Sequence, residues 1–202
     1  MKDAIPANNL LHRFDEGNIA RSLQLPQPTL ELDFRMSIKL NPAIPVGQGS
    51  FGHRNWVSFI GGQWAGRWGK GSVIVSILPS TRPTLLMFFQ PGGQDSQLIV
   101  KDLATQVSAR YLLQTNDDPP AFITVNQSGW RTGEKAILEK LEDPMQADTI
   151  NPNTYKFRLN VELETGDERY AFLNSCMWVG SGCRRGAEGV FKYNAFPIKA
   201  NI

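Results

Sequence analysis

The chain has 202 residues, of which 41% are hydrophobic and 20% charged, and its formal net charge is +2. This length predicts one domain whose core is large enough to fold without disulfides or a structural metal. The small net charge argues against a nucleic-acid partner. Two cysteines and two histidines exclude a disulfide-dense scaffold, a four-cysteine metal site and a histidine-rich metal cluster. We therefore expect no metal and no nucleic acid.

The first 28 residues are predicted to form a leader or strap before a single barrel domain at residues 29–202, because prolines 6, 26 and 28 prevent a long helix. They lack the basic start and apolar run of a signal peptide, and no stretch of the chain approaches the roughly 20 apolar residues of a membrane span. We expect a cytoplasmic protein with both cysteines free and no membrane partner.

Two segments alternate strictly between apolar and polar residues, which is the pattern of a strand with one buried face. They are Leu30–Leu40 and Tyr155–Leu163. Shorter strand-like runs are predicted at 56–60, 72–78, 84–90, 97–100, 107–114, 122–125 and 190–196. A further strand at 170–179 is predicted to follow a hairpin turn at Gly166-Asp167. The 18 glycines and 13 prolines supply turns between these runs.

One segment, Thr132–Asp143, has helical spacing, with Thr132 as the cap and Pro144 as the end. About ten strands with one short helix predict an all-β fold, an antiparallel barrel of about 8–10 strands. A β-sandwich is the alternative. A barrel of this size can enclose one small ligand.

Several motifs in order resemble the bacterial and fungal family known as domain of unknown function 3237, a calycin-like β-barrel. The motifs lie at 46–47, 52–54, 60–66, 91–95, 109–118, 157–158 and 170–174. The resemblance spans about Leu30 to Ile198. It departs from the family pattern at Ala65, at Ser96 and at Asp118-Pro119, and adds a segment at about 77–89. These departures imply a specialised member.

His53 and Arg54 are the first candidate catalytic pair, after a glycine-rich loop at 47–52. The adjacent guanidinium disfavours imidazolium, so a neutral His53 ring would accept a proton as a general base. The alternative is a surface histidine bonded to the backbone.

Asp95 is the second candidate acid or base, in the Gly-Gly-x-Asp motif of the resembled family. In an apolar pocket the pKa of its carboxyl would rise. The alternative is an Asx turn or an ion pair with Arg110.

Arg110 and Arg158 lie among apolar neighbours in predicted strands. If they point inward, Asp95, Glu162 and Asp117 are their candidate partners, and an inward arginine would stabilise an oxyanion. Ordinary cross-strand ion pairs on the outer face are the alternative. We assign Arg110 as catalytic and Arg158 and Glu162 as substrate-binding.

Aromatic side chains are candidates for a pocket that binds a flat apolar ligand. Those assigned to substrate binding are Trp56, Trp64, Phe89, Tyr111 and Trp178. Packing in the core is the alternative for each tryptophan.

The leading hypothesis is a cofactor-independent isomerase or cyclase acting on a small hydrophobic oxygenated metabolite in natural-product biosynthesis. It rests on the family resemblance and on the lack of cofactor and metal motifs, so we expect no cofactor. Two alternatives are a lipocalin-like carrier without catalysis and an interaction module with a filled barrel. An apolar run, Leu85–Phe89, also suits a homodimer contact.

Overall fold

The computed structural model describes residues 13–23, 28–74, 92–186 and 190–200. Chain contacts define two units: a barrel unit, Leu30–Ile198, and a terminal unit, Met1–Thr29 with Lys199–Ile202. In the terminal unit, α1 (Ile19–Ser22) is capped by the Asn18 side chain, which accepts a hydrogen bond from the Ala20 backbone N–H at 2.9 Å. Strand β1 is Pro28–Leu30. Among the described residues, no helix is long and apolar enough to cross a membrane.

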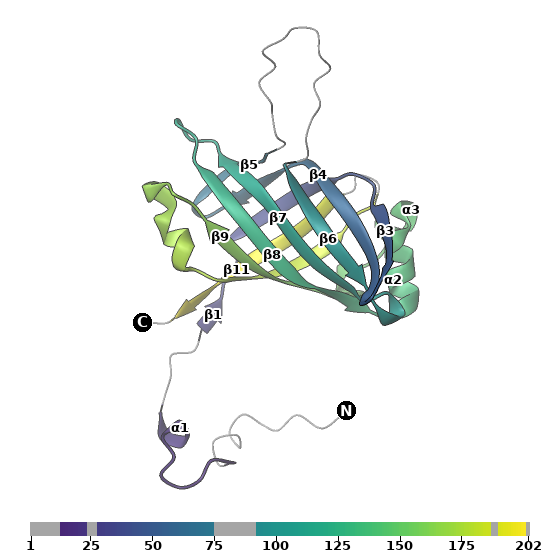
Figure 1. Ribbon diagram of the computed structural model, residues 1–202. Helices are drawn as coiled ribbons and strands as arrows, with labels where there is room; N and C mark the ends of the chain where they lie inside the picture. The colour runs from purple at the N-terminus through teal and green to yellow at the C-terminus, as the bar shows by residue number, and fades with distance from the viewer. Residues whose placement is uncertain (1–12, 24–27, 75–91, 187–189, 201–202) are drawn as a thin grey trace. The chain divides into compact units, whose positions relative to one another are not determined.

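The strands of the barrel unit pair antiparallel in a closed cycle (Figure 1). In chain order the cycle contains β2 (Phe34–Leu40), β4 (Gly52–Gly66), β5 (Gly69–Val73), β7 (Thr105–Thr115), β8 (Phe122–Gly133), β9 (Tyr155–Glu164), β10 (Trp178–Arg184) and β11 (Val190–Ala200). The pairing of β11 with β2 closes it. Two further strands, β3 (Ile44–Gly49) and β6 (Gly93–Ile99), pair with β4, and β6 also pairs with β7. The predicted all-β antiparallel barrel is confirmed.

Strict alternation of buried and exposed side chains explains the central wall of the barrel. All ten residues of β9 alternate, from buried Tyr155 to exposed Glu164, as the sequence pattern predicts. Strand β7 begins in the same way, from buried Thr105 onward. Because successive side chains of a strand point to opposite faces, the buried set forms the barrel core.

Short helices lie at the two ends of the barrel (Figure 1). At one end are α2 (Lys135–Glu142) and α3 (Pro144–Ala147), and α2 buries Leu138 and Leu141 in the core. At the other end lies η5 (Glu168–Ser175), near the turn between β7 and β8. Two shorter 3-10 turns, η3 (Lys101–Leu103) and η4 (Pro152–Thr154), connect strands. The predicted helix at 132–143 is correct in kind, but β8 continues through Gly133.

The long alternating segment Leu30–Leu40 is interrupted at Asp33. Leu30 and Leu32 are exposed, and the alternation holds only from Phe34 onward. Asp33 is buried instead, because its Oδ2 accepts hydrogen bonds from two indole N–H groups, those of Trp68 (3.1 Å) and Trp178 (2.8 Å). These bonds satisfy a buried carboxylate and break the predicted strand in two.

The predicted strand at 170–179 is wrong in its first half. Asp167 caps η5 by accepting a hydrogen bond from the Arg169 backbone N–H at 3.0 Å, so Gly166-Asp167 leads into a helix rather than a hairpin. Tyr170 and Leu173 are buried three residues apart, which is the spacing of a 3-10 helix. Strand structure resumes at Trp178.

Three further segments differ from their predicted structure or lie outside the described residues. The glycine-rich segment 47–52 is not a loop but a tight hairpin in which Gly49 pairs with Gly52. The predicted strand at 72–78 begins earlier, as β5 at Gly69, and its residues 75–78 lie outside the described residues. The predicted strand at 84–90, including Leu85–Phe89, lies outside the described residues.

Candidate functional site

Seven of the described polar side chains are buried at inner-face positions of β6, β7 and β8. We call six of them, all but Thr115 at the last position of β7, the inner polar group. They are Asp95, Gln97, Thr105, Tyr111, Gln127 and Arg131. On β7, Thr105 and Tyr111 share the buried face with Ala109, and the ladder pairs both Asp95 and Gln127 with Ala109, and Arg131 with Thr105. Gln97 stands two residues from Asp95 and therefore lies on the same face of β6. A cluster of buried polar groups inside an apolar barrel costs stability unless each member is hydrogen-bonded.

Asp95 is the buried carboxyl of this group, with 4% of its surface exposed. Its Oδ2 accepts a hydrogen bond from Gln97 Nε2 at 2.8 Å, and its Oδ1 accepts one from the Ser108 backbone N–H at 2.9 Å. Asp95 pairs with Ala109 across the ladder, and Ala109 pairs with Gln127. The small Ala109 side chain therefore separates a carboxyl on one side from an amide on the other.

Burial raises the pKa of the Asp95 carboxyl above its ordinary value. The hydrogen bonds from Gln97 and Ser108 and the positive charge of Arg131 lower this pKa, but burial outweighs them. A carboxyl that binds its proton more tightly than usual in a dry interior can act as an acid and then as a base.

The raised pKa makes a testable prediction about stability. The pKa of Asp95 in the unfolded chain is about 3.9, and burial raises it in the folded state. Between these two pKa values the folded state keeps the proton that the unfolded state has lost, so the free energy of unfolding falls as pH rises, until pH passes the folded-state pKa. Asp95→Asn does not ionise, so its free energy of unfolding relative to the unmodified protein should increase between the two pKa values and stay constant above the higher one. Urea unfolding of both proteins from pH 4 to 8 measures this difference, and a constant or shrinking difference would contradict the dominance of burial.

Tyr111 and Gln127 form the second contact of the inner polar group. The Tyr111 hydroxyl donates a hydrogen bond to Gln127 Oε1 at 3.0 Å, and the Tyr111 ring meets Phe59 edge to face with centroids 5.4 Å apart. The Tyr111 phenol and the Gln127 amide are thus held in fixed orientations close to Ala109, the residue that pairs with Asp95. Tyr111 was predicted to bind substrate, and it does face the interior.

Arg131 and Thr105 form the end of the group nearest α2. Arg131 Nη2 donates to Thr105 Oγ1 at 3.1 Å and is paired with Glu142 at the end of α2. Glu142 also accepts a hydrogen bond from Arg184 Nη1 at 3.0 Å. Neither Arg131 nor Gln127 was a sequence candidate. A sequence signal for them does exist: Ile123 and Val125 occupy every second position of β8, and Gln127 and Arg131 continue the same odd-numbered positions.

Arg110, assigned as catalytic, and Glu162, assigned to substrate binding, both lie on the outer face, which is the alternative given for the arginine. Arg110 pairs across the ladder with Asn126, and Asn126 pairs with Glu162. Asn126 Nδ2 donates to Glu162 Oε2 at 3.1 Å. Together they line an outer groove of about 970 Å³ that also contains Cys176 and Met177. The reason is parity, because Arg110 is an even position on a strand whose odd positions are buried.

This outward position predicts small effects for two substitutions. Arg110→Ala and Glu162→Ala should each change the free energy of unfolding by less than about 0.5 kcal/mol, because exposed charged side chains contribute little. Neither should alter binding of a ligand inside the barrel. Denaturant unfolding and ligand titration measure both, and a loss of interior binding would place Arg110 back in the site.

His53 and Arg54 lie at the start of β4, far from Asp95. His53 pairs with Ile99, whereas Asp95 pairs with Val57, four residues further along β4. Four strand residues span about 13 Å. His53 borders a separate open hollow of about 450 Å³ at the β3–β4 hairpin. The structure thus does not bring the predicted catalytic residues His53 and Asp95 together.

The aromatic candidates divide between core and surface. Trp64 and Trp178 are buried, whereas Trp56 is 37% exposed and points outward opposite Ile44. Arg158 is also exposed, and its Nη1 donates to its neighbour's carbonyl, that of Phe157, at 3.1 Å. Phe89 lies outside the described residues.

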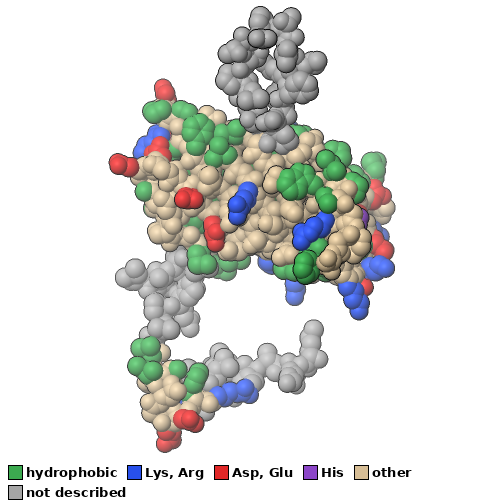
Figure 2. Space-filling view, viewed as in Figure 1, with side chains coloured by type: hydrophobic (Ala, Val, Ile, Leu, Met, Phe, Trp, Pro, Cys, Tyr) green, Lys and Arg blue, Asp and Glu red, His purple; other side chains and the backbone are tan. Residues whose placement is uncertain are grey.

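On the face shown in Figure 2, basic and acidic side chains are scattered among apolar ones.

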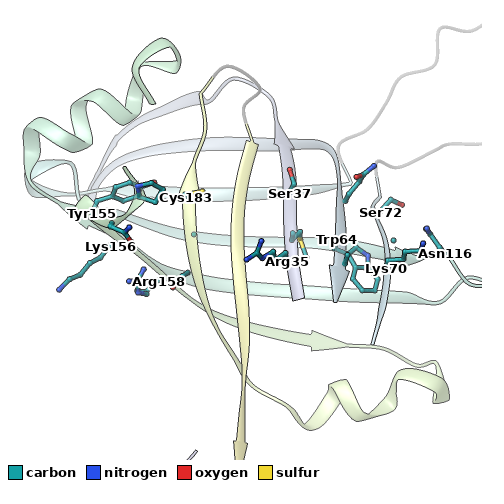
Figure 3. Close-up of a pocket in the computed structure, with 18 residues that line it drawn as sticks. Arg35, Ser37, Trp64, Lys70, Ser72, Asn116, Tyr155, Lys156, Arg158 and Cys183 are labelled. Carbon is teal, nitrogen blue, oxygen red and sulfur yellow. The ribbon is translucent and has the colours of Figure 1, made fainter. Parts of the chain in front are cut away.

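A hollow of about 970 Å³ borders β11 (Figure 3). Its lining comes from β2, β4 and β5 on one side, including Arg35 and Lys70, and from β9 and β10 on the other, including Arg158 and Cys183. Strand β11 runs between these two sides because it pairs with both β2 and β10. No member of the inner polar group lines this hollow. We therefore do not place the candidate site there.

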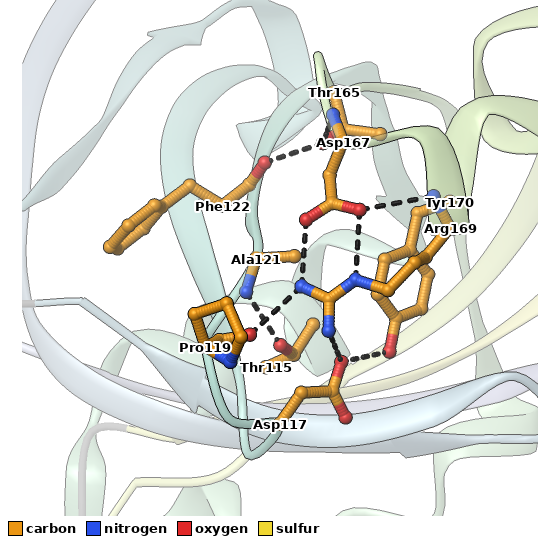
Figure 4. A network of polar contacts seen from close by, with 9 residues as sticks. All are labelled: Thr115, Asp117, Pro119, Ala121, Phe122, Thr165, Asp167, Arg169 and Tyr170. Atoms are coloured by element: carbon orange, nitrogen blue, oxygen red, sulfur yellow. Dashed lines mark hydrogen bonds and ion pairs between the residues drawn. The ribbon is translucent and has the colours of Figure 1, made fainter.

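Hydrogen bonds and ion pairs among Asp117, Pro119, Asp167, Arg169 and Tyr170, which we call the polar clasp, lie at the end of the barrel opposite α2 (Figure 4). Arg169 Nη2 contacts Asp167 Oδ2 at 2.7 Å and donates to the Pro119 carbonyl at 2.8 Å. The Tyr170 hydroxyl donates to Asp117 Oδ2 at 2.5 Å, and this bond holds the pKa of Asp117 below its usual value. The clasp joins η5 to the β7–β8 turn, so Asp117 is a structural partner here and not a partner of Arg110.

These features define a closed antiparallel β-barrel with a buried, hydrogen-bonded carboxyl facing its interior. A family model described as "Protein of unknown function (DUF3237)" matches residues 28–198, and the chain belongs to this family. The resemblance seen in the sequence is thereby confirmed.

Relatives with known structures share the barrel. The UPF0311 protein RPA1785 of Rhodopseudomonas palustris is 26% identical over 159 residues, covering 78% of this chain and 90% of the relative. The crystal structure of RPA1785 superposes with a TM-score of 0.71 at 22% identity, covering 87% of this chain and 100% of that one. A β-barrel-like protein of Acinetobacter baumannii gives 0.66 at 26% identity, with 87% and 99% covered. A structure described as an enzyme from Penicillium herquei gives 0.53 at 21% identity, with 87% and 98% covered.

Proposed function

We propose that this protein is a cofactor-independent isomerase or cyclase for a small hydrophobic oxygenated metabolite, with natural-product biosynthesis as its context. The observation that carries the proposal is the buried Asp95 carboxyl, whose pKa is raised by burial and whose two oxygens are held by Gln97 and the Ser108 N–H. Of the four residues predicted to be catalytic, Asp95 alone is buried.

The proposed chemistry is a proton transfer without net redox change. In its acid form, Asp95 donates its proton to a carbonyl oxygen or an alkene carbon of the substrate. The carboxylate that results then accepts a proton from a neighbouring C–H or O–H group, which restores the acid and leaves a product of unchanged composition. Such general acid–base catalysis contributes about 10²- to 10⁴-fold to a rate.

The neighbours of Asp95 supply positioning. The Gln127 amide and the Tyr111 hydroxyl lie beyond the small Ala109 side chain, where they can donate or accept hydrogen bonds to a substrate oxygen. Apolar side chains of the core surround them and would fold a hydrophobic substrate into one conformation. The barrel of the Penicillium herquei protein, described as an enzyme, supports the view that this architecture is compatible with catalysis.

The proposal is tested by incubating the purified protein, without added cofactor, with hydrophobic ketone, enol and polyene metabolites in deuterated water. Mass spectrometry should detect an isomer with the mass of the substrate plus exchanged deuterium. Tight binding of such compounds without conversion would favour the carrier hypothesis instead. Neither binding nor conversion would favour a filled interaction module.

A further inference from the structure

Arg131 is a buried cation that has more hydrogen-bond donors than partners. It is 2% exposed, and only its Nη2 makes the bonds to Thr105 and Glu142. Its Nε–H is buried and has no partner among the described residues. A guanidinium carries five donors in a fixed plane, and a buried donor without an acceptor is rare in folded proteins. Among the described residues, the structure therefore leaves one charged donor in the interior without an acceptor, and an oxygen of a ligand would satisfy it.

The charges around Arg131 do not balance. Arg131 and Arg184 share a single carboxylate, that of Glu142, which contacts one of them through each oxygen. The charge of Arg131 also reaches Asp95, but burial favours the neutral form of that carboxyl. Within the part of the chain that the structure describes, two guanidinium groups thus contact one carboxylate at the α2 end of the barrel, and an additional negative charge would be stabilised there.

Strand pairing sets the distance between Arg131 and the proposed catalytic residue Asp95, which lies level with Gln127 across the sheet. Gln127 and Arg131 lie four residues apart on the same face of β8, which is about 13 Å along a strand. Gly129 stands between them and contributes no side chain. Its missing Cβ is required by the close approach of β9, because a Cβ would lie 2.0 Å from the Arg158 carbonyl oxygen. The backbone between the two polar positions therefore stays free of a side chain.

We propose that Arg131 binds a carboxylate or enolate oxygen of the substrate through its Nε–H, so that the substrate is a hydrophobic organic acid or vinylogous acid. This inference rests on the proposed function, since it places the acidic end of the same substrate whose reacting carbon or oxygen lies at Asp95. The apolar body of the molecule would lie between these two ends, beside Val107 and Leu159. A charge-assisted hydrogen bond in a dry site is stronger than a neutral one, so it selects an acid over its neutral isostere.

The test compares two probes of the same shape, 2-naphthoate and 2-naphthamide, by titration of the tryptophan fluorescence and by calorimetry. The unmodified protein should bind the carboxylate about tenfold or more tightly than the amide. Arg131→Met should remove this preference. Arg131→Lys keeps a positive charge for Glu142 but has no Nε–H, so it should preserve folding while losing most of the preference. Arg67→Met, which removes an exposed guanidinium paired with Glu31, should retain the preference in full.

Equal affinity of the two probes, or no binding of either, in the unmodified protein would overturn the inference, as would an unchanged preference in Arg131→Lys. These readouts need no turnover. If Arg131→Met and Arg131→Lys lose the preference for the carboxylate but turnover does not depend on Asp95, the binding role of Arg131 is supported and the proposed catalysis is rejected. Turnover that requires Asp95, with no preference for acids, would reject only the role of Arg131.

Discussion

Replacing Asp95 by Asn is expected to lower turnover of the substrate by about 10²- to 10⁴-fold, the contribution of a general acid–base group. The amide is nearly the same size as the carboxyl but neither releases nor accepts a proton near neutral pH. Substrate binding should change little, because the other members of the inner polar group remain. The expected kinetic signature is a lower kcat with a KM close to that of the unmodified protein, measured on the isomer that the deuterium experiment identifies.

The hydrogen bonds of Asp95 make Asn a matched replacement. The Asn oxygen can accept from the Ser108 N–H, and the Gln97 amide can rotate to present its oxygen to the new N–H group. Asp95→Ala lacks both contacts and leaves the Ser108 N–H without its acceptor, so it should lose stability as well as turnover. Full turnover in Asp95→Asn would remove Asp95 from the mechanism. The same loss in Asp95→Asn and in Gln97→Ala, with equal unfolding free energies, would point to positioning rather than proton transfer.

The strand pattern of this chain was predictable where alternation is strict and unbroken. Tyr155–Leu163 became β9 almost residue for residue, because every second side chain is apolar and large enough to fill the core. Leu30–Leu40 has the same pattern, yet its first half lies outside the core. The hydrogen bonds that hold Asp33 come from Trp68 and Trp178, which are distant in sequence, so no local pattern contains them.

The candidate site was predictable only in part, for a similar reason. Asp95 was a candidate because it belongs to a Gly-Gly-x-Asp motif. Arg131 was not, because the polar residues that precede it do not look like part of a buried strand. The alternation Ile123, Val125, Gln127 continues inward to Arg131, but polar residues at inward positions look like the end of a strand. Arg110 shows the opposite error. Its neighbours are apolar, yet its position on β7 has the parity of the exposed face.

Replacing Trp178 by Ala is expected to cost about 4 kcal/mol of unfolding free energy, within the range of large aromatic truncations in a core. Trp178 is 1% exposed, packs edge to face on Phe34 with centroids 6.2 Å apart, and donates its indole N–H to Asp33. Alanine would leave a cavity and remove one of the two donors that satisfy a buried carboxylate. For a domain of ordinary stability this is a large fraction of the total.

Three further variants separate packing from hydrogen bonding in this region. Trp178→Phe keeps a ring but has no N–H, and it should cost about half as much as Trp178→Ala. Asp33→Asn should cost less than about 1 kcal/mol, because both indoles donate to the same oxygen, Oδ2, and an amide oxygen can take its place. Asp33→Ala leaves two buried indole donors unpaired and should cost more than Asp33→Asn. Denaturant unfolding of the four variants gives these differences. If Asp33→Ala were as stable as Asp33→Asn, the indole bonds would contribute nothing, and the interruption of the Leu30–Leu40 alternation would need another cause.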